Sequence, residues 1–125
     1  MKLIVVDDEE DVQFLFQQKF RKEIKSGEVN IRFALNGSSA LNLLDSIENR
    51  YEYCILSDIN MPEMTGIELL KRIKSKYPKL KVIMITAYGD EQNFRQAKEL
   101  GAEDYFTKPL EFESLRTRLS QLDII

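Results

Sequence analysis

The sequence has no histidine, no tryptophan and a single cysteine, and it has no apolar run long enough to cross a bilayer. Without histidine, the chain lacks the usual acid/base group of enzymes and the commonest metal ligand. The lone Cys54 excludes a disulfide or cysteine–zinc framework, and its place in the apolar run "YCIL" predicts a buried thiol. The opening "MKLIVV" is too soon interrupted by acids to be a signal peptide. We therefore expect a cytoplasmic protein with no membrane partner.

An excess of positive charge is also missing. The chain has 18 Lys and Arg against 21 Asp and Glu, for a net charge of −3. This balance gives no electrostatic reason to expect nucleic acid or an anionic membrane as a direct partner. A length of 125 residues with 43% hydrophobic residues instead predicts a single folded domain over 1–125.

Apolar runs alternate along the chain with patterns of helical period. Residues 3–6, 53–56 and 82–86 are continuously apolar, as expected of strands that are covered on both faces in a parallel sheet. Residues 31–35 alternate and suit an edge strand, and 104–106 form a short fifth strand. Apolar residues recur at helical spacing over 12–24, 40–47, 67–77, 94–100 and 112–122. The pattern predicts an α/β fold of five βα units, a doubly wound parallel sheet with helices on both faces.

Polar residues follow four of these strands, where sites form in open parallel sheets. Asp7 and Asp8 follow the first strand, and Asp58 follows the third. Thr86 ends the fourth strand, and Lys108 comes shortly after the fifth. The sequence therefore predicts carboxylates, a hydroxyl and an ammonium group at one rim of the sheet.

Clustered carboxylates need a cation. At about 5 Å and an effective dielectric of about 20, each like-charged pair costs on the order of 3 kcal/mol. Oxygen ligands of this kind suit Mg²⁺, which often shares a phosphate group with the protein. Lys108 would add a point charge for a phosphoryl group, and Thr86 a hydrogen bond.

Each residue also has a purely structural explanation. Acids favour the start of a helix, which suffices for Glu9, Glu10 and Asp11. Asp8 could be an N-cap, Asp58 a turn former, Thr86 a helix cap and Lys108 a solvated charge. Their coincidence at consecutive strand ends favours a site.

The chain resembles the CheY-like receiver domains of two-component response regulators over essentially its whole length. The motifs are "VVDDE" (5–9), "SDINMPEMTGIELL" (57–70), "VIMITAYG" (82–89) and "AEDYFTKPL" (102–110). The resemblance implies a flavodoxin-like three-layer sandwich with strand order 2-1-3-4-5. It also implies that residues 1–125 are either a stand-alone receiver or one taken from a longer regulator.

The resemblance further implies a role for each site residue. Asp58 would accept a phosphoryl group from the phosphohistidine of a sensor histidine kinase or a histidine phosphotransfer protein. Asp58, Asp8 and the backbone carbonyl of Asn60 would bind Mg²⁺, with Asp7 acting through a water molecule. The remaining implied roles are phosphoryl binding by Lys108, Thr86 and the Ala87 amide, switching by Thr86 and Tyr105, and a cis peptide bond before Pro109.

The implied function is a phosphorylation switch, not a turnover enzyme. Thr86 and Tyr105 would relay the change to the face formed by helix 94–100, strand 104–106 and helix 112–122. That face would serve a downstream effector domain, a target protein or a phosphorylation-dependent homodimer, and the kinase would dock near the first helix and the loop after the last strand. Asn60 and Tyr88 would tune the lifetime of the phosphoryl group.

Three alternatives remain at this point. A receiver-like module could act by interaction alone, without phosphorylation. A flavodoxin-like flavin or nucleotide binder would need a phosphate-cradling loop after the first strand, where five acids stand instead. A haloacid-dehalogenase-type phosphatase would need an Asp-x-Asp motif there, which is absent.

Overall fold

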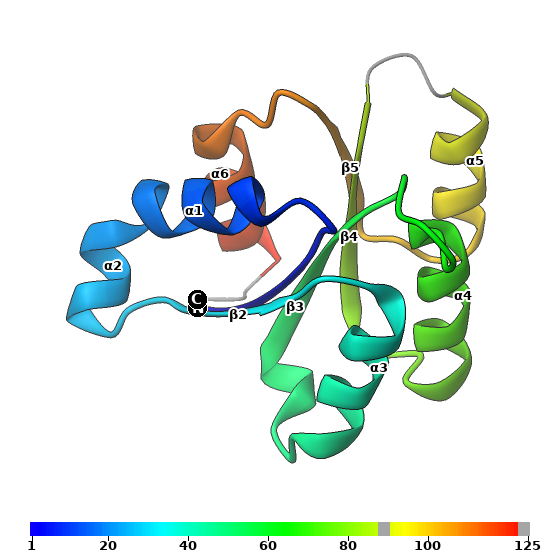
Figure 1. Ribbon diagram of the computed structural model, residues 1–125, viewed down its shortest axis with the longest axis horizontal. Coiled ribbons are helices and arrows are strands. Elements are labelled where there is room, and N and C mark those ends of the chain that lie inside the picture. Colours follow the sequence, from blue (N-terminus) through cyan, green and yellow to red (C-terminus); the bar gives the residue numbers. More distant parts are fainter. Residues whose placement is uncertain (88–90, 123–125) are drawn as a thin grey trace.

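The computed structural model describes residues 1–87 and 91–122 and contains one parallel sheet with helices on both faces (Figure 1). The strands are β1 (Lys2–Val6), β2 (Asn30–Ala34), β3 (Tyr53–Asp58), β4 (Lys81–Thr86) and β5 (Asp104–Thr107). Their order is β2-β1-β3-β4-β5, and every neighbouring pair is parallel. The predicted α/β class, parallel pairing and strand order are thus confirmed.

Six α-helices and one short 3₁₀ helix occur within the described residues. They are α1 (Glu10–Lys19), α2 (Arg21–Ser26), α3 (Gly37–Ser46), the 3₁₀ helix η1 (Arg50–Glu52), α4 (Gly66–Lys76), α5 (Glu91–Glu99) and α6 (Phe112–Gln121). Figure 1 shows α1, α2 and α6 on one side of the sheet and α3, α4 and α5 on the other. None of these helices is both long and apolar enough to cross a membrane.

Two apolar cores follow from the alternation of side chains along the strands. Leu3 and Val5 of β1 pack with Phe16, Phe20 and α6 on one face. Their neighbours in the sequence, Ile4 and Val6, pack with α3, α4 and α5 on the other face. Both faces of the sheet are therefore buried, which explains why the central strands are continuously apolar.

The first helical segment differs from its sequence pattern. Residues 12–24 predicted one helix, whereas the structure has two that meet at Phe20, with φ −106° and ψ 18°. The helical spacing also predicted too many core residues, because Leu15, Ile24 and Phe94 are 40%, 37% and 43% exposed. Cys54 is fully buried as predicted, and burial raises the pKa of its thiol to about 12.

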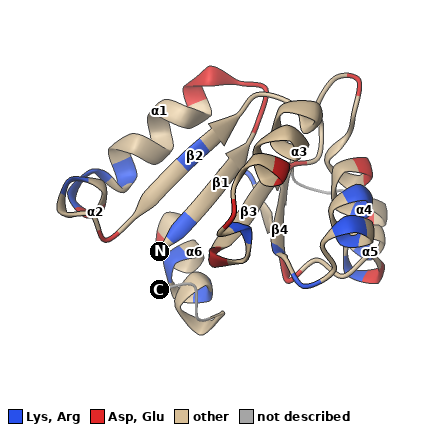
Figure 2. Cartoon of the chain, turned by 90° about the horizontal axis from the view of Figure 1, so that it is seen from below, with Lys and Arg blue, Asp and Glu red and all other residues tan. Residues whose placement is uncertain are grey.

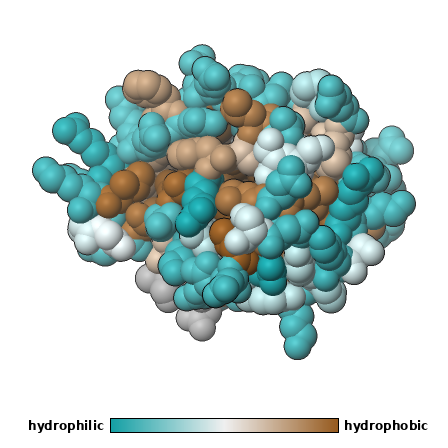
Figure 3. Space-filling model, turned by 60° about the horizontal axis from the view of Figure 1, so that its bottom comes forward, coloured by the Kyte–Doolittle hydropathy of each residue, from teal (hydrophilic) through white to brown (hydrophobic). Residues whose placement is uncertain are grey.

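Apolar residues also reach the surface. Phe14 of α1 is 73% exposed, more than any other large apolar residue that the structure describes. Figure 3 shows one side of the molecule on which a band of apolar residues is bordered by hydrophilic ones.

Gly66, at the start of α4, allows the helix to approach β3 closely. A Cβ atom at this position would lie 2.1 Å from the carbonyl oxygen of Asp58 and 2.7 Å from the Cα of Ile59. The Gly66 amide donates to the carbonyl of Ile59 at 2.8 Å. The glycine therefore fixes the backbone that carries Asp58, and no other residue fits without a shift of this backbone.

Candidate functional site

The polar residues predicted at the strand ends lie together at one rim of the sheet. Asp7 directly follows β1, Asp58 ends β3 and Thr86 ends β4. Backbone hydrogen bonds fix this rim: Asp7 donates to the carbonyl of Ala34 at 3.1 Å, and Lys108 donates to the carbonyl of Thr86 at 2.7 Å. Because β1 lies between β2 and β3, this is the point where the chain reverses its winding direction.

Three carboxylates gather at this reversal point. One oxygen from each of Asp7, Asp8 and Asp58 lies within 4.8 Å of the others. Asp7 and Asp58 are 4% and 5% exposed, whereas Asp8 is exposed. Figure 2 shows the acidic stretch between β1 and the start of α1. An all-oxygen set with two buried carboxylates fits a hard divalent cation such as Mg²⁺.

The pKa of Asp58 is raised above its ordinary value. Burial is the largest cause and the nearby Asp7 carboxylate adds to it, while Lys108 and the backbone amides of Asn60 and Ile59 oppose the shift. The carboxylate thus carries its charge in a poorly solvated place, where a bound cation would favour the charged form.

Lys108 places its ammonium group beside the two buried acids. Its Nζ lies 3.2 Å from Oδ2 of Asp7 and 3.6 Å from Oδ2 of Asp58. Burial lowers the pKa of Lys108, but Asp58 and Asp7 outweigh burial, and the net pKa is raised. The Lys108–Pro109 peptide bond is cis. Lys108 is therefore a protonated, paired group at this rim and not a solvated surface charge.

Thr86 is fully buried, and its hydroxyl has no hydrogen-bond partner among the described residues. It lies within β4, and its hydroxyl makes no hydrogen bond to the described part of the chain, so it does not cap the helix that follows. A buried hydroxyl without a partner is costly unless another state satisfies it. The Thr86 hydroxyl is thus a group that a bound oxyanion could satisfy.

The other structural explanations fare differently. The N-cap of α1 is Glu9, so Asp8 is not a cap, and Asp58 belongs to a strand rather than a turn. Glu10 and Asp11 do lie in the first turn of α1, where the helix dipole favours them.

The remaining predicted residues surround this rim. Ala87 and Asn60 are exposed at the ends of β4 and β3. Tyr105 in β5 is partly buried, and its ring packs edge-to-face on Phe94 of α5 at 4.8 Å. Tyr88 lies outside the described residues.

A crevice beside the rim was not predicted from the sequence. It has a volume of about 510 Å³, lies between α1 and the segment from Lys108 into α6, and reaches Asp58. Apolar side chains from both walls line it, among them Val12, Leu15, Leu110 and Phe112. The signal for it was the adjacent pair Leu15 and Phe16, because two neighbouring apolar residues cannot both face the centre of one buried helix face.

The fold and this rim define a doubly wound α/β domain with a candidate divalent-cation site at its reversal point. The family model of the response regulator receiver domain matches residues 3–120. The chain belongs to this family. Receiver domains are signalling modules of two-component systems and not turnover enzymes.

Individual proteins agree with this assignment. The chain is 36% identical over 115 residues to sporulation initiation phosphotransferase F of Bacillus subtilis, covering 92% of this chain and 87% of that protein. It is 33% identical to the transcriptional regulatory protein SrrA of Staphylococcus aureus, of which it covers 47%, with 97% of this chain aligned. The receiver domain of the Francisella response regulator 1452 superposes with a TM-score of 0.81 at 27% identity, over 97% of this chain and 94% of that one.

Proposed function

We propose that the chain is a phosphoacceptor switch in which Asp58 receives a phosphoryl group from a phosphohistidine. The donor would be a sensor histidine kinase or a histidine phosphotransfer protein. The observation that carries the proposal is the position of Lys108 Nζ, 3.2 Å from Asp7 and 3.6 Å from Asp58, at the edge of a three-carboxylate cluster.

In the transfer step, a carboxylate oxygen of Asp58 attacks phosphorus in line with the donor histidine. A new P–O bond forms as the P–N bond breaks, and the imidazole nitrogen keeps the electron pair. Lys108 would neutralise one of the phosphoryl oxygens, and the Thr86 hydroxyl and Ala87 amide would donate hydrogen bonds to the others.

Mg²⁺ fits the carboxylates at this rim. Asp8, Asp58 and the carbonyl of Asn60 would hold the ion directly, and Asp7 would hold it through a water molecule. When bound, Mg²⁺ supplies positive charge against the phosphoryl oxygens, which otherwise meet three carboxylates.

The switch would run from Thr86 to Tyr105. The unpaired hydroxyl of Thr86 gives it a reason to move toward a phosphoryl oxygen. Tyr105, packed on the same side of the sheet, could then turn toward the space that Thr86 leaves. The α5–β5–α6 face would carry this change to an effector domain, a target protein or a second copy of the chain.

We propose residues 1–125 as one receiver domain, whether alone or in a longer regulator. The chain spans 87% of the Bacillus protein but only 47% of SrrA, so its relatives include one protein of similar length and one that is about twice as long.

The test is the intact mass after incubation with acetyl phosphate. We expect a gain of one phosphoryl group that requires Mg²⁺ and is lost in Asp58→Asn. Asp11→Asn is the matched control, because Asp11 lies in the first turn of α1 outside the cluster. If the wild type gains no mass and shows no Mg²⁺-dependent response to beryllofluoride, the chain is a phosphorylation-independent interaction module instead.

A further inference from the structure

The bend between α1 and α2 needs a specific cause. Residues 10–26 contain neither glycine nor proline, the usual sources of a helix kink. Helical hydrogen bonds run on both sides of the bend, from the Phe20 amide to the carbonyl of Phe16 and from the Ile24 amide to the carbonyl of Phe20. The backbone is therefore bent locally and not frayed.

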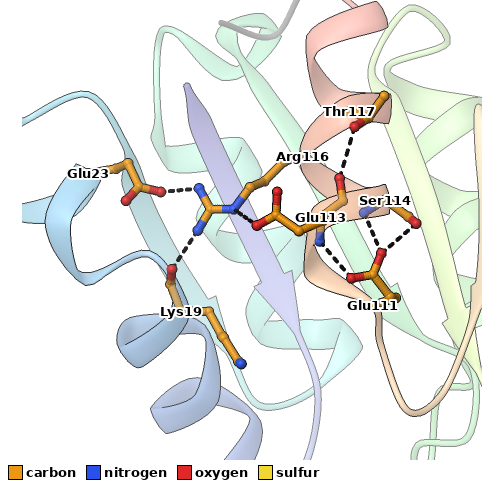
Figure 4. Close-up of polar contacts among 7 residues, drawn as sticks. All are labelled: Lys19, Glu23, Glu111, Glu113, Ser114, Arg116 and Thr117. Atoms are coloured by element: carbon orange, nitrogen blue, oxygen red, sulfur yellow. Dashed lines mark hydrogen bonds and ion pairs between the residues drawn. The ribbon is translucent and has the colours of Figure 1, made fainter.

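Arg116 of α6 sits at this bend (Figure 4). Its Nη2 donates to the carbonyl of Lys19 at 2.5 Å, and its Nη1 pairs with the carboxylate of Glu23. In an uninterrupted helix the carbonyl of Lys19 would accept from the amide of Glu23. A side chain that competes for such a carbonyl is a recognised cause of kinks, so the guanidinium accounts for the bend.

The same guanidinium is fixed from two further directions. Its central carbon lies 4.2 Å from the ring centre of Phe20, and its Nε lies 3.5 Å from Oε1 of Glu113. Phe20 is fully buried and packs on Phe16 and Phe112 at ring distances of 6.2 and 6.1 Å. Arg116 thus clamps the bend of the first helical segment onto α6, with four contacts on one planar group.

This clamp shapes the crevice that reaches Asp58. One wall of the crevice is α1, through Val12 and Leu15, and the other is the start of α6, through Phe112 and Arg116. The clamp joins the two walls at the end of α1 farthest from its N-terminus. Arg116 therefore lies where it can hold α1 at a fixed distance from α6.

We propose that Arg116 is a positioning residue for phosphoryl transfer from a protein donor. By fixing α1 over the crevice, Arg116 sets where a docked donor presents its phosphohistidine to Asp58. A small phosphodonor needs only the rim itself and should not depend on the clamp. The inference rests on the proposed function, because it concerns the access route to the same acceptor.

The test compares two donors across four proteins. Arg116→Gln and Glu23→Gln break the clamp from either side. Arg72→Gln is the control, because it makes the same substitution in an exposed Arg–Glu ion pair within α4, with Glu68 at 3.1 Å, on the opposite layer of the molecule. The donors are acetyl phosphate and a purified, autophosphorylated histidine kinase that phosphorylates the wild type.

We expect Arg116→Gln to slow transfer from the kinase by about five-fold or more, because small misplacements cost an in-line reaction heavily. The acetyl phosphate rate should stay within about two-fold of the wild type, and Glu23→Gln should show a smaller loss of the same kind. Hydrogen exchange of the amides of 20–26 should speed up in both clamp variants and not in Arg72→Gln.

Three results would overturn the proposed role of Arg116. They are an equal loss with both donors, no loss with the kinase, and unchanged exchange at 20–26. If Arg116→Gln fails to fold, Glu23→Gln decides the same comparison. A wild type that acetyl phosphate does not phosphorylate would instead overturn the proposed function, so the two failures are distinguishable.

Discussion

The charge of Asp58 should cost the folded protein stability when no cation is bound. One of its carboxylate oxygens lies within 4.8 Å of one of Asp7, which gives a repulsion of at least about 3 kcal/mol at an effective dielectric of about 20. Lys108 at 3.6 Å returns about 4–5 kcal/mol, and the exposed Asp8 removes part of that. These attractions and repulsions nearly cancel. Burial therefore decides whether the charge of Asp58 stabilises or destabilises the folded protein, and burial is also the largest cause of the raised pKa of Asp58.

Asp58→Asn should therefore stabilise the metal-free protein by about 1–2 kcal/mol at pH 7. Because the pKa of Asp58 is raised in the folded state, the free energy of unfolding depends on pH. The folded state binds the Asp58 proton more tightly than the unfolded state, so wild-type stability falls as pH rises from the ordinary carboxyl range through the raised pKa. The difference between Asp58→Asn and the wild type should vanish below that range, where the carboxyl is neutral in both states.

Urea unfolding followed by circular dichroism in EDTA measures this effect. Mg²⁺ should reverse the order, because a bound ligand stabilises the wild type by about 2.7 kcal/mol at 100 times its Kd, and the variant would lack the carboxylate that we propose as a direct ligand. Asp11→Asn is the control and should lose about 0.3–1 kcal/mol, since it removes only a favourable helix-dipole interaction. A destabilised Asp58→Asn in EDTA, or equal stabilisation of both proteins by Mg²⁺, would refute the reasoning.

Three further predictions concern single residues. Lys108→Met should raise the pKa of Asp58 further and lower the rate of phosphorylation by acetyl phosphate at least ten-fold, read by intact mass, while Mg²⁺ still binds. Thr86→Val removes a buried hydroxyl without a partner, so it should leave the free energy of unfolding within about 1 kcal/mol while it blunts the fluorescence response of the tyrosines to beryllofluoride. Gly66→Ala should cost about 1–3 kcal/mol in urea unfolding, because its Cβ would overlap the backbone of Asp58, and a neutral result would contradict that close approach.

The sheet was predictable because its information is local. Runs such as 53–56 and 82–86 are apolar on both faces, and this alone indicates buried parallel strands. The rim followed from one topological rule, since residues after parallel strands meet at one edge. The structure brings Asp7, Asp58 and Lys108 together where this rule expects them.

The bend at Phe20 was not predictable in this way. Its cause is Arg116, which is 93 residues from its partner Glu23 in the sequence, and nothing in the helical pattern of 12–24 records that contact. The exposure of Phe94 was missed for a similar reason. Its partner is Tyr105 on a neighbouring element, so a residue at core spacing lies at the surface and covers a second aromatic ring. Long-range pairs of side chains, and not backbone propensities, decide these details.

The ammonium group of Lys108 and the carboxylate of Asp7 are 101 residues apart in the chain, although they touch in the folded protein. β1, which leads into Asp7, is held between β2 and β3, whereas β5, which leads into Lys108, is the last of the five described strands to be synthesised. A nascent or truncated chain would thus have acids with no lysine to meet them. The ion pair at the rim therefore forms only after all five described strands have been made.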